Sequence, residues 1–182
     1  MNIDLVFPAL PPALDGIGDH TARLATALSA HHTVRIWTAE PTPTPLPGVD
    51  IRTGVHFDSR SGLQTLARDI AATPPDAVVL QYNPFSYGRW GLNLALPGLL
   101  PSLRRHTPET RLAVMVHEPF VPVESLRFAV FTTWQRWQLW QLGRAADMLF
   151  FSIAPWVDRF GAWFPNTPCH LLPVGSNIPV AP

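Results

Sequence analysis

Short apolar runs alternate along the chain with segments whose apolar residues recur at helical spacing. A run of four to eight apolar or β-branched residues bounded by turn formers predicts a strand, and apolar residues three and four positions apart predict a helix. The predicted strands are Ile3–Phe7, Val34–Thr38, Asp50–Thr53, Ala77–Tyr82, Leu112–His117, Met148–Ser152 and His170–Pro173. The predicted helices are Gly18–Ala30, Ser61–Ala72 with a serine cap, Leu92–Arg105 interrupted by prolines, Ser125–Ala146 and Ala154–Phe164.

The alternation of strands and helices predicts an α/β fold. Parallel strands need long crossover connections, and helices in those connections cover the faces of the sheet. We therefore expect a Rossmann-like, three-layer αβα domain with a mostly parallel sheet of about seven strands. The domain is expected to span residues 1–172, and the proline-bounded segment 173–182 is expected to begin a linker.

Composition narrows the possible functions. The 182 residues include 13 cationic and 13 acidic side chains, for a formal net charge of zero, and none of the cations is lysine. No basic field exists to drive nucleic-acid binding, and the lysine of a Walker-type loop, a pyridoxal Schiff base or a kinase strand is missing. With 47% hydrophobic and 14% charged residues, the chain is not disordered and is expected to offer apolar surface to a partner.

The cysteine count, the histidine spacing and the hydropathy of the chain allow predictions about metal binding and cellular location. The single cysteine, Cys169, can form neither an internal disulfide nor a multi-thiolate zinc site, and histidines and acids do not cluster, so we expect no metal. The first apolar run has no basic region before it, and no apolar stretch reaches the length of about 18 residues that a membrane span requires. We expect a cytoplasmic protein.

The loop after the first predicted strand is a candidate ligand site, because open parallel sheets bind ligands beyond the carboxyl ends of their strands. Gly16 and Gly18 precede a helix whose free N–H groups could bind a phosphate, although a simple turn with a helix cap would use the same glycines. A dinucleotide site is disfavoured, because Thr21 stands where a third glycine or alanine is expected.

Two further strand ends carry candidate chemistry. Gln81, Tyr82 and Asn83 combine amides, which match sugar hydroxyls, with an aromatic face, although a turn built on Asn-Pro is the alternative. His117 and Glu118 end the fifth strand, where a histidine could donate a hydrogen bond or move a proton, and a capped core histidine is the alternative.

The longest predicted helix has apolar residues on two faces, and its only charged residues after Ser125 are arginines. At about 100° per residue, one wide arc and one narrow arc of apolar side chains result. One arc can face the sheet, and the other is either buried under neighbouring elements or in contact with a membrane surface, which favours tryptophan and arginine. The wide arc holds Leu126, Ala129, Val130, Trp134, Trp137 and Trp140, and the narrow arc holds Phe128, Phe131, Leu139 and Leu142.

Taken together, these segments resemble the N-terminal domain of the retaining GT-B glycosyltransferases of family 4. The resemblance covers nearly the whole chain and rests on the segments Asp15–Ala25, His117–Pro119, Arg144–Asp147 and Pro173–Pro179. The family usually has a Gly-Gly pair where this chain has Asp15-Gly16. The resemblance implies one half of a GT-B fold, which binds the acceptor while a C-terminal half binds the nucleotide-sugar. That half carries a Glu-x7-Glu pattern, and no two of the four glutamates here have this spacing, so the donor domain or subunit is expected to be missing.

The resemblance also implies a reaction and roles for residues. A sugar would pass from a nucleoside-diphosphate-sugar, the co-substrate, to an acceptor hydroxyl with retention and without a metal or other cofactor. His117 would be the catalytic residue beside the reacting sugar. The donor-diphosphate loop would be Gly16, Ile17 and Gly18; the acceptor would be bound by Asp19, His20, Gln81, Tyr82, Asn83 and Glu118; and the hinge would be Gly175, Ser176 and Asn177.

The implied partners are the missing donor domain and a sugar or lipid-linked acceptor, and this chain alone is expected to be inactive. Contact through Trp134, Trp137 and Trp140 would bring the protein to the inner face of a membrane. Two other classes are open at this point: a non-catalytic carbohydrate-binding or scaffold domain, and a different nucleotide-binding enzyme of Rossmann type.

Overall fold

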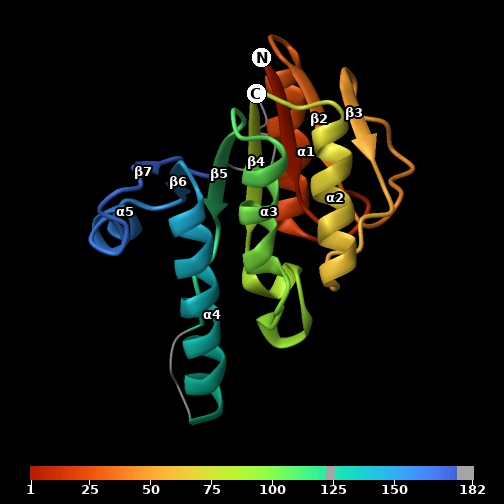
Figure 1. Ribbon diagram of the computed structural model, residues 1–182. Helices are drawn as coiled ribbons and strands as arrows, with labels where there is room; N and C mark the ends of the chain where they lie inside the picture. Colours follow the sequence, from red (N-terminus) through yellow and green to blue (C-terminus); the bar gives the residue numbers. More distant parts are fainter. Residues whose placement is uncertain (122–125, 176–182) are drawn as a thin grey trace, which may run out of the picture.

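The computed structural model describes residues 1–121 and 126–175, without the side chains of residues 126–128. Within these ranges the chain forms a seven-stranded sheet, all of whose pairings are parallel, in the order β3-β2-β1-β4-β5-β6-β7. The chain starts in the middle of the sheet, builds one edge and then crosses over to build the other (Figure 1). The strands are β1 (Asn2–Val6), β2 (Thr33–Trp37), β3 (Val49–Arg52), β4 (Ala77–Tyr82), β5 (Arg111–Val116), β6 (Met148–Phe151) and β7 (Cys169–Leu171).

Helices cover the two faces of the sheet unequally. In Figure 1, α2, α3 and α4 lie in front of the sheet and α1 lies behind it. The α-helices of the described ranges are α1 (Gly16–Ser29), α2 (Arg60–Ala72), α3 (Leu99–His106), α4 (Leu126–Ala145) and α5 (Ala154–Gly161). The Rossmann-like α/β architecture predicted from the sequence is confirmed.

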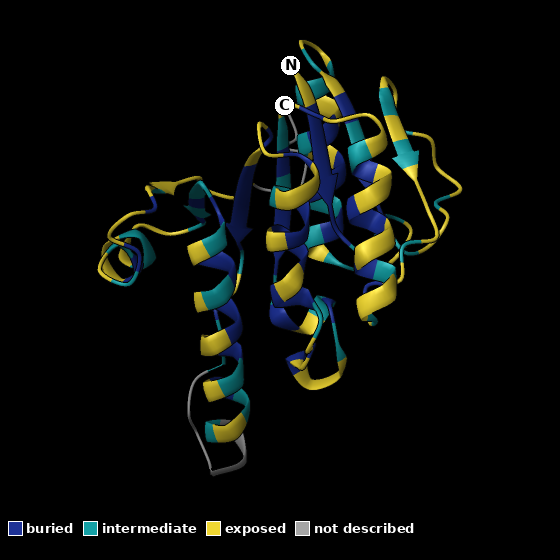
Figure 2. Ribbon diagram, in the orientation of Figure 1, coloured by how far each residue is buried: buried dark blue, intermediate teal, exposed yellow. Residues whose placement is uncertain are grey.

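Two apolar clusters hold these layers together. On the α1 face, Ala22 and Ala25 pack against Leu5 and Ile36. On the other face, α2, α3, α4 and α5 pack against alternate residues of the strands, such as Val114 of β5. The central strands β1, β4 and β5 are dark blue along most of their length in Figure 2, and each fully buried leucine or isoleucine contributes about 1.5–3 kcal/mol.

The β2 and β1 strands also share a buried ion pair. The Arg35 Nε donates to Asp4 Oδ1 over 2.7 Å, and the Trp37 Nε1 donates to Asp4 Oδ2 over 2.7 Å. Burial of Asp4 raises its pKa, and the hydrogen bonds from Arg35 and Trp37 oppose that rise.

The segment between β4 and α3 differs from the prediction of a helix starting at Leu92. It forms three short 3-10 turns, at Pro84–Ser86, Arg89–Gly91 and Leu96–Gly98, and α3 begins only at Leu99. Asn93 is the physical reason, because its side chain satisfies backbone groups that a helix would pair internally. Its Nδ2 donates to the carbonyls of Phe57 and Tyr87, both over 2.7 Å, and its Oδ1 accepts from the N–H of Ala95 and Leu96, both over 2.9 Å.

The serine cap of α2 is also displaced from its predicted position. Ser59 caps this helix, not Ser61, and its Oγ accepts from the N–H of Gly62 over 3.1 Å. Both serines precede the apolar run, and only Ser59 has the extended backbone that a cap needs, with φ −129° and ψ 148°.

Helix α4 turns polar side chains toward the protein and tryptophans away from it. Thr132, Gln135 and Gln138 are buried, whereas Trp137 and Trp140 are 41% and 37% exposed. Figure 2 shows yellow bands along the outer side of α4 and dark blue along its inner side. Leu139 and Leu142 of the narrow arc are fully buried, whereas Val130 of the wide arc is 69% exposed. The side chains of Leu126 and Phe128, which belong to the two arcs, lie outside the described part of the structure.

Three buried polar side chains of α4 form hydrogen bonds to other segments, although Gln138 Oε1 and Trp134 Nε1 have no hydrogen-bond partner among the described residues. Thr132 Oγ1 donates to the carbonyl of Val121 over 2.8 Å, and Gln135 Oε1 accepts from the Val121 N–H over 2.9 Å. Gln138 Nε2 donates to the Tyr82 hydroxyl over 3.1 Å. These bonds offset the cost of burying the polar groups and attach α4 to the segment that follows β5. No helix in the described ranges is both long enough and apolar enough to cross a bilayer.

Candidate functional site

The connection between β1 and α1 brings the start of a helix to the carboxyl edge of the sheet. Asp15 caps this helix, and its Oδ1 accepts from the N–H groups of Ile17 and Gly18 over 2.8 and 2.9 Å. The carboxylate therefore occupies two of the donors that a phosphate would otherwise use at this helix end. Gly16 is exposed, and a Cβ built on it would meet nothing within 4 Å.

Gly18 has a different role from Gly16. A Cβ built on Gly18 would lie 2.6 Å from the backbone oxygen of Ala9, so a side chain there would collide with the loop that precedes the helix. The absence of a side chain at Gly18 lets α1 pack closely on residues 9 and 10. Of the three residues predicted to form a phosphate loop, Gly16 is thus the one with open space around its Cα.

His117 follows β5 and lies next to Gln81 of β4. The backbone N–H of His117 donates to the carbonyl of Tyr82 over 2.9 Å, which extends the hydrogen-bonded pairing of β4 and β5 by one residue. Gln81 pairs with Met115, so the Gln81 side chain and that of His117 lie on the same face of the sheet, the face that α1 covers. The Nε2 of His117 is 2.7 Å from the Oε1 of Gln81, and an amide oxygen can only accept, so Nε2 is the protonated nitrogen in this arrangement.

His20, in the first turns of α1, completes this group. Its ring packs edge-on against the ring of His117, with centroids 5.0 Å apart and planes at 73°. Burial lowers the pKa of His117 to about 4, with a further contribution from His20, and burial also lowers the pKa of His20. Both imidazoles are therefore neutral at pH 7, and the Nδ1 of His117 carries a lone pair that can accept a hydrogen bond.

Two buried polar atoms in this group have unused hydrogen-bonding capacity. Within the described residues, neither the Nε2 of Gln81 nor the Nε2 of His20 has a hydrogen-bond partner. Gln81 itself is fully buried. Because an unpaired buried polar group costs free energy, a hydroxyl group that reached these two atoms would form hydrogen bonds that the described residues do not supply.

Asn83 and Glu118 form a second pair just beyond the ends of β4 and β5. The Nδ2 of Asn83 donates to Glu118 Oε2 over 3.2 Å, and its Oδ1 accepts from the Phe85 N–H over 2.9 Å. Asn83 therefore also caps the first 3-10 turn after β4. Glu118 is exposed.

The structure does not bring all of the predicted site residues together. Tyr82 points to the opposite face from Gln81, because successive residues of a strand alternate, and its ring is fully buried among α2, α3 and α4. Asp19 precedes His20 in α1 and forms no hydrogen bond to His117 or Gln81 among the described residues. Gly175 is exposed, and the other two predicted hinge residues, at 176 and 177, lie outside the described residues.

Tyr87 is a supporting residue that the sequence did not single out. Its hydroxyl donates toward the backbone oxygens of Gln81 and Val6, at 2.7 and 3.1 Å, and its side chain is almost fully buried. It links the ends of β1 and β4 beneath the site. A tyrosine in a loop rich in polar residues gave no periodic signal, so only the tertiary structure identifies this role.

No three His, Cys, Asp or Glu side chains in the described part of the chain converge in a way that could hold a metal ion. What the arrangement can do chemically is to hydrogen-bond uncharged polar groups, with neutral imidazoles and an amide as donors and acceptors.

Comparisons with known proteins give similarity of fold alone. No protein-family model matches the sequence, and no curated protein does either. Among solved structures, the UDP-forming α,α-trehalose-phosphate synthase of Burkholderia vietnamiensis superposes with a TM-score of 0.55 at 13% identity, over 96% of this chain and 48% of that one. The α,α-trehalose 6-phosphate synthase of Burkholderia multivorans gives a TM-score of 0.53 at 13% identity, over 97% of this chain and 48% of that one.

Oxidoreductases are equally similar. A short-chain dehydrogenase/reductase of Serratia marcescens superposes with a TM-score of 0.56 at 12% identity, over 93% of this chain and 94% of that one. The chain spans about half the length of the trehalose-phosphate synthases that it matches, at 48%. The Rossmann-like fold is thus shared with trehalose-phosphate synthases and with a short-chain dehydrogenase/reductase.

Proposed function

We propose that this chain is the acceptor-binding half of a retaining glycosyltransferase, which acts together with a donor-binding domain or subunit. The observation that carries the proposal is the neutral His117, held by Gln81 and flanked by His20, with unpartnered polar atoms on both neighbours. Such a group suits an uncharged ligand rich in hydroxyls better than an anion. Residues 1–172 would form the acceptor domain, and residues 173–182 would begin the linker to the donor domain.

In this proposal each residue has a distinct task. His117 would hydrogen-bond a hydroxyl of the reacting sugar, and the Nε2 of Gln81 and the Nε2 of His20 would bind other hydroxyls. Asn83 and Glu118 would bind the outer part of the acceptor. The N–H groups of Ile17 and Gly18 already donate to the Asp15 carboxylate. Gly16 would therefore be the residue of this loop that approaches the donor diphosphate. Sugar would be transferred with retention from a nucleoside-diphosphate-sugar, and the nucleoside diphosphate would leave.

A second candidate is a nucleotide-binding oxidoreductase, favoured by the superposition on a short-chain dehydrogenase/reductase over nearly the full length of both chains. One feature of α1 argues against it. Thr21, where the dinucleotide fingerprint has glycine or alanine, is fully buried and donates to the carbonyl of Ile17 over 2.7 Å.

The outward face of α4 supports a membrane-associated acceptor. Trp137 and Trp140 are exposed, and the Arg144 guanidinium lies 4.5 Å from the Trp140 ring centroid. Tryptophan and arginine without acidic neighbours are typical of helices at the interface of anionic bilayers. We propose that this face makes peripheral contact with a membrane from which a lipid-linked acceptor would be presented.

The acceptor role is tested by ligand binding to the chain itself. We expect a sugar or sugar phosphate from a panel of acceptors to shift the imidazole resonances of His117 and His20 in NMR spectra, and NADPH to leave them unchanged. The His117→Ala variant should lose the effect, and the matched variant His106→Ala, on the exposed end of α3, should keep it. Shifts with NADPH and with no sugar would favour the oxidoreductase.

The catalytic role needs the donor half. When the chain is joined or mixed with a matching donor domain, release of nucleoside diphosphate should depend on acceptor and should fall about 100-fold in the His117→Ala variant. An unchanged rate would contradict the role of His117. Acceptor binding without turnover in any such mixture would favour a non-catalytic carbohydrate-binding domain.

Membrane contact is tested by sedimentation with vesicles that contain anionic lipid. The Trp137→Ser/Trp140→Ser variant should sediment less than the wild type. The Leu14→Ser variant, which changes a fully exposed residue of the β1–α1 connection, should sediment like the wild type. Equal sedimentation of all three proteins would exclude this face of α4 as the contact.

A further inference from the structure

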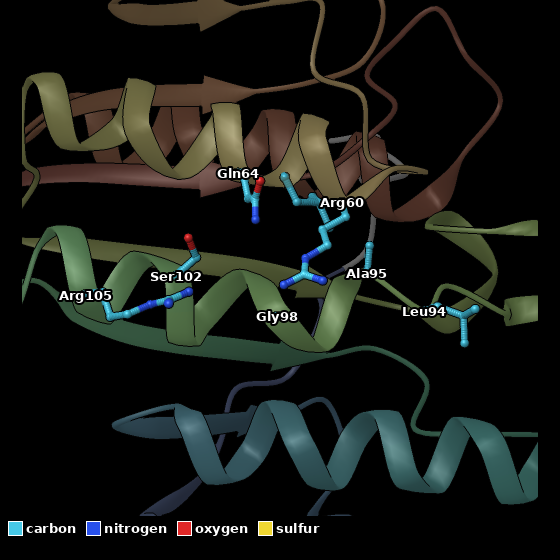
Figure 3. Close-up of a pocket in the computed structure, with 8 residues that line it drawn as sticks. Arg60, Gln64, Leu94, Ala95, Gly98, Ser102 and Arg105 are labelled. Atoms are coloured by element: carbon cyan, nitrogen blue, oxygen red, sulfur yellow. The ribbon is translucent and has the colours of Figure 1, made fainter.

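A hollow of about 200 Å³ lies between α2 and α3, on the face of the sheet opposite to His117. Its polar lining comes from Arg60 and Gln64 of α2 and from Ser102 and Arg105 of α3, and part of its apolar lining is Leu94. Figure 3 shows the Arg60 side chain reaching from α2 toward α3, and the Arg105 side chain running along α3 toward Ser102.

The two arginines of the hollow are available to a ligand. In the described part of the chain, neither Arg60 nor Arg105 forms a hydrogen bond or an ion pair, whereas Arg35 and Arg104 are each bound to a carboxylate. No acidic side chain lines the hollow. Two unpaired guanidinium groups facing one small hollow create a local excess of positive charge in a chain with no net charge.

The helix N-termini that border the hollow add to its positive electrostatic potential. Arg60 is the first residue of α2, and Gly98 directly precedes α3, so the N-termini of both helices border the hollow. Gly98 gives α3 no side-chain cap, and a Cβ built on it would meet nothing within 4 Å. Arg105 lies in the last turn of α3, so the partial positive charges of the two helix N-termini add to the charge at the Arg60 end of the hollow.

The uncharged side chains that line the hollow indicate a ligand larger than an inorganic anion. Ser102 is 4% exposed, so its hydroxyl lies at the floor, and Leu94 is 82% exposed at the rim. A volume of about 200 Å³ corresponds to about seven water molecules, which is room for a phosphate group and several further atoms.

We propose that the hollow between α2 and α3 binds a small organic phosphate. Arg60 and Arg105 hold the phosphate oxygens, Ser102 and Gln64 supply hydrogen bonds, and the organic part lies against Leu94. The site is separate from the group around His117, because the sheet lies between them, and it does not depend on the proposed sugar transfer.

The proposal is tested by titrating the chain with phenyl phosphate and with inorganic phosphate, following the Nε–Hε resonances of arginine by NMR. We expect phenyl phosphate to shift the signals of Arg60 and Arg105 and to bind more tightly than inorganic phosphate. The Arg105→Gln and Arg60→Gln variants should each weaken binding about tenfold, the loss expected for a charge-assisted hydrogen bond.

Two further variants make the test specific. Arg68→Gln removes the same charge from α2, but Arg68 is bound to Gln64 O and Thr65 Oγ1 and does not line the hollow, so binding should change less than about twofold. Gly98→Leu fills the hollow without backbone strain and should abolish binding. Equal losses in Arg68→Gln and Arg105→Gln, unimpaired binding in Gly98→Leu, equal affinities for the two phosphates, or no binding would each overturn the proposal.

Discussion

The low pKa of His117 makes a quantitative prediction about stability. Burial and the neighbouring His20 lower this pKa to about 4 from its usual 6.5. The folded protein therefore binds a proton at His117 less readily than the unfolded chain does. Such a group does not lower the free energy of unfolding above about pH 6.5. As the pH falls from 6.5 toward 4, it lowers that free energy progressively. His20, whose pKa is also lowered, acts in the same direction.

The size of the effect follows from the two pKa values. The full difference corresponds to about 3 kcal/mol, and at pH 5, where the unfolded chain is protonated at this residue and the folded protein mostly is not, the loss is about 2 kcal/mol. The His117→Gln variant has no titrating group at this position. Its free energy of unfolding should therefore fall by about 2 kcal/mol less than that of the wild type between pH 7.5 and pH 5.

Urea denaturation at several pH values measures this difference. Because the change in the free energy of unfolding with pH is compared, the pH-independent effect of the substitution itself cancels. Titration of the imidazole nitrogens by NMR gives the pKa directly. If His117 titrates near 6.5, or if the wild type and the His117→Gln variant lose the same stability between pH 7.5 and 5, then His117 is not buried as described, and its assignment as a neutral hydrogen-bonding group is refuted.

Four other substitutions, at three positions, test the packing. Gly18→Ala should lower the free energy of unfolding by about 1–3 kcal/mol, because its Cβ would collide with the Ala9 oxygen, whereas Gly16→Ala should change it by less than about 1 kcal/mol; urea denaturation compares the two. Asp4→Ala should cost about 3 kcal/mol because it leaves Arg35 unpaired, and Asp4→Asn, which keeps a hydrogen-bond acceptor, should cost less; an equal cost in calorimetry would mean that the charge of Asp4 is the whole effect.

Much of the fold could be predicted from the sequence, because its signals are local. Each buried strand is a short apolar run, and the predicted bounds of Ala77–Tyr82 match β4 residue for residue. The rule that ligand groups follow the carboxyl ends of parallel strands also placed Gln81 and His117 near each other. The alternation of side chains along β4 would have separated Tyr82 from Gln81 and could have been applied to the sequence.

The rest depends on contacts between distant segments. The two apolar arcs of α4 gave no means of deciding which one is inward, because Gln135 and Gln138 can be buried only where the Val121 N–H and the Tyr82 hydroxyl meet them. The start of α3 was missed for a similar reason, since Asn93 binds the carbonyl of Phe57, 36 residues away. The sequence also did not show that the Asp15 carboxylate takes the N–H groups of Ile17 and Gly18.

The four hydrogen bonds of Asn93 have a consequence for proteolysis. The connection between β4 and α3 has only short 3-10 turns, so by its secondary structure it should be an easy site for a protease. Asn93 is 4% exposed and joins this connection to the segment before α2. We therefore expect proteases to cut the Asn93→Ala variant first between residues 83 and 98, while the wild type resists there. One amide side chain would thus determine whether the connection behaves as a rigid part of the domain or as an open loop.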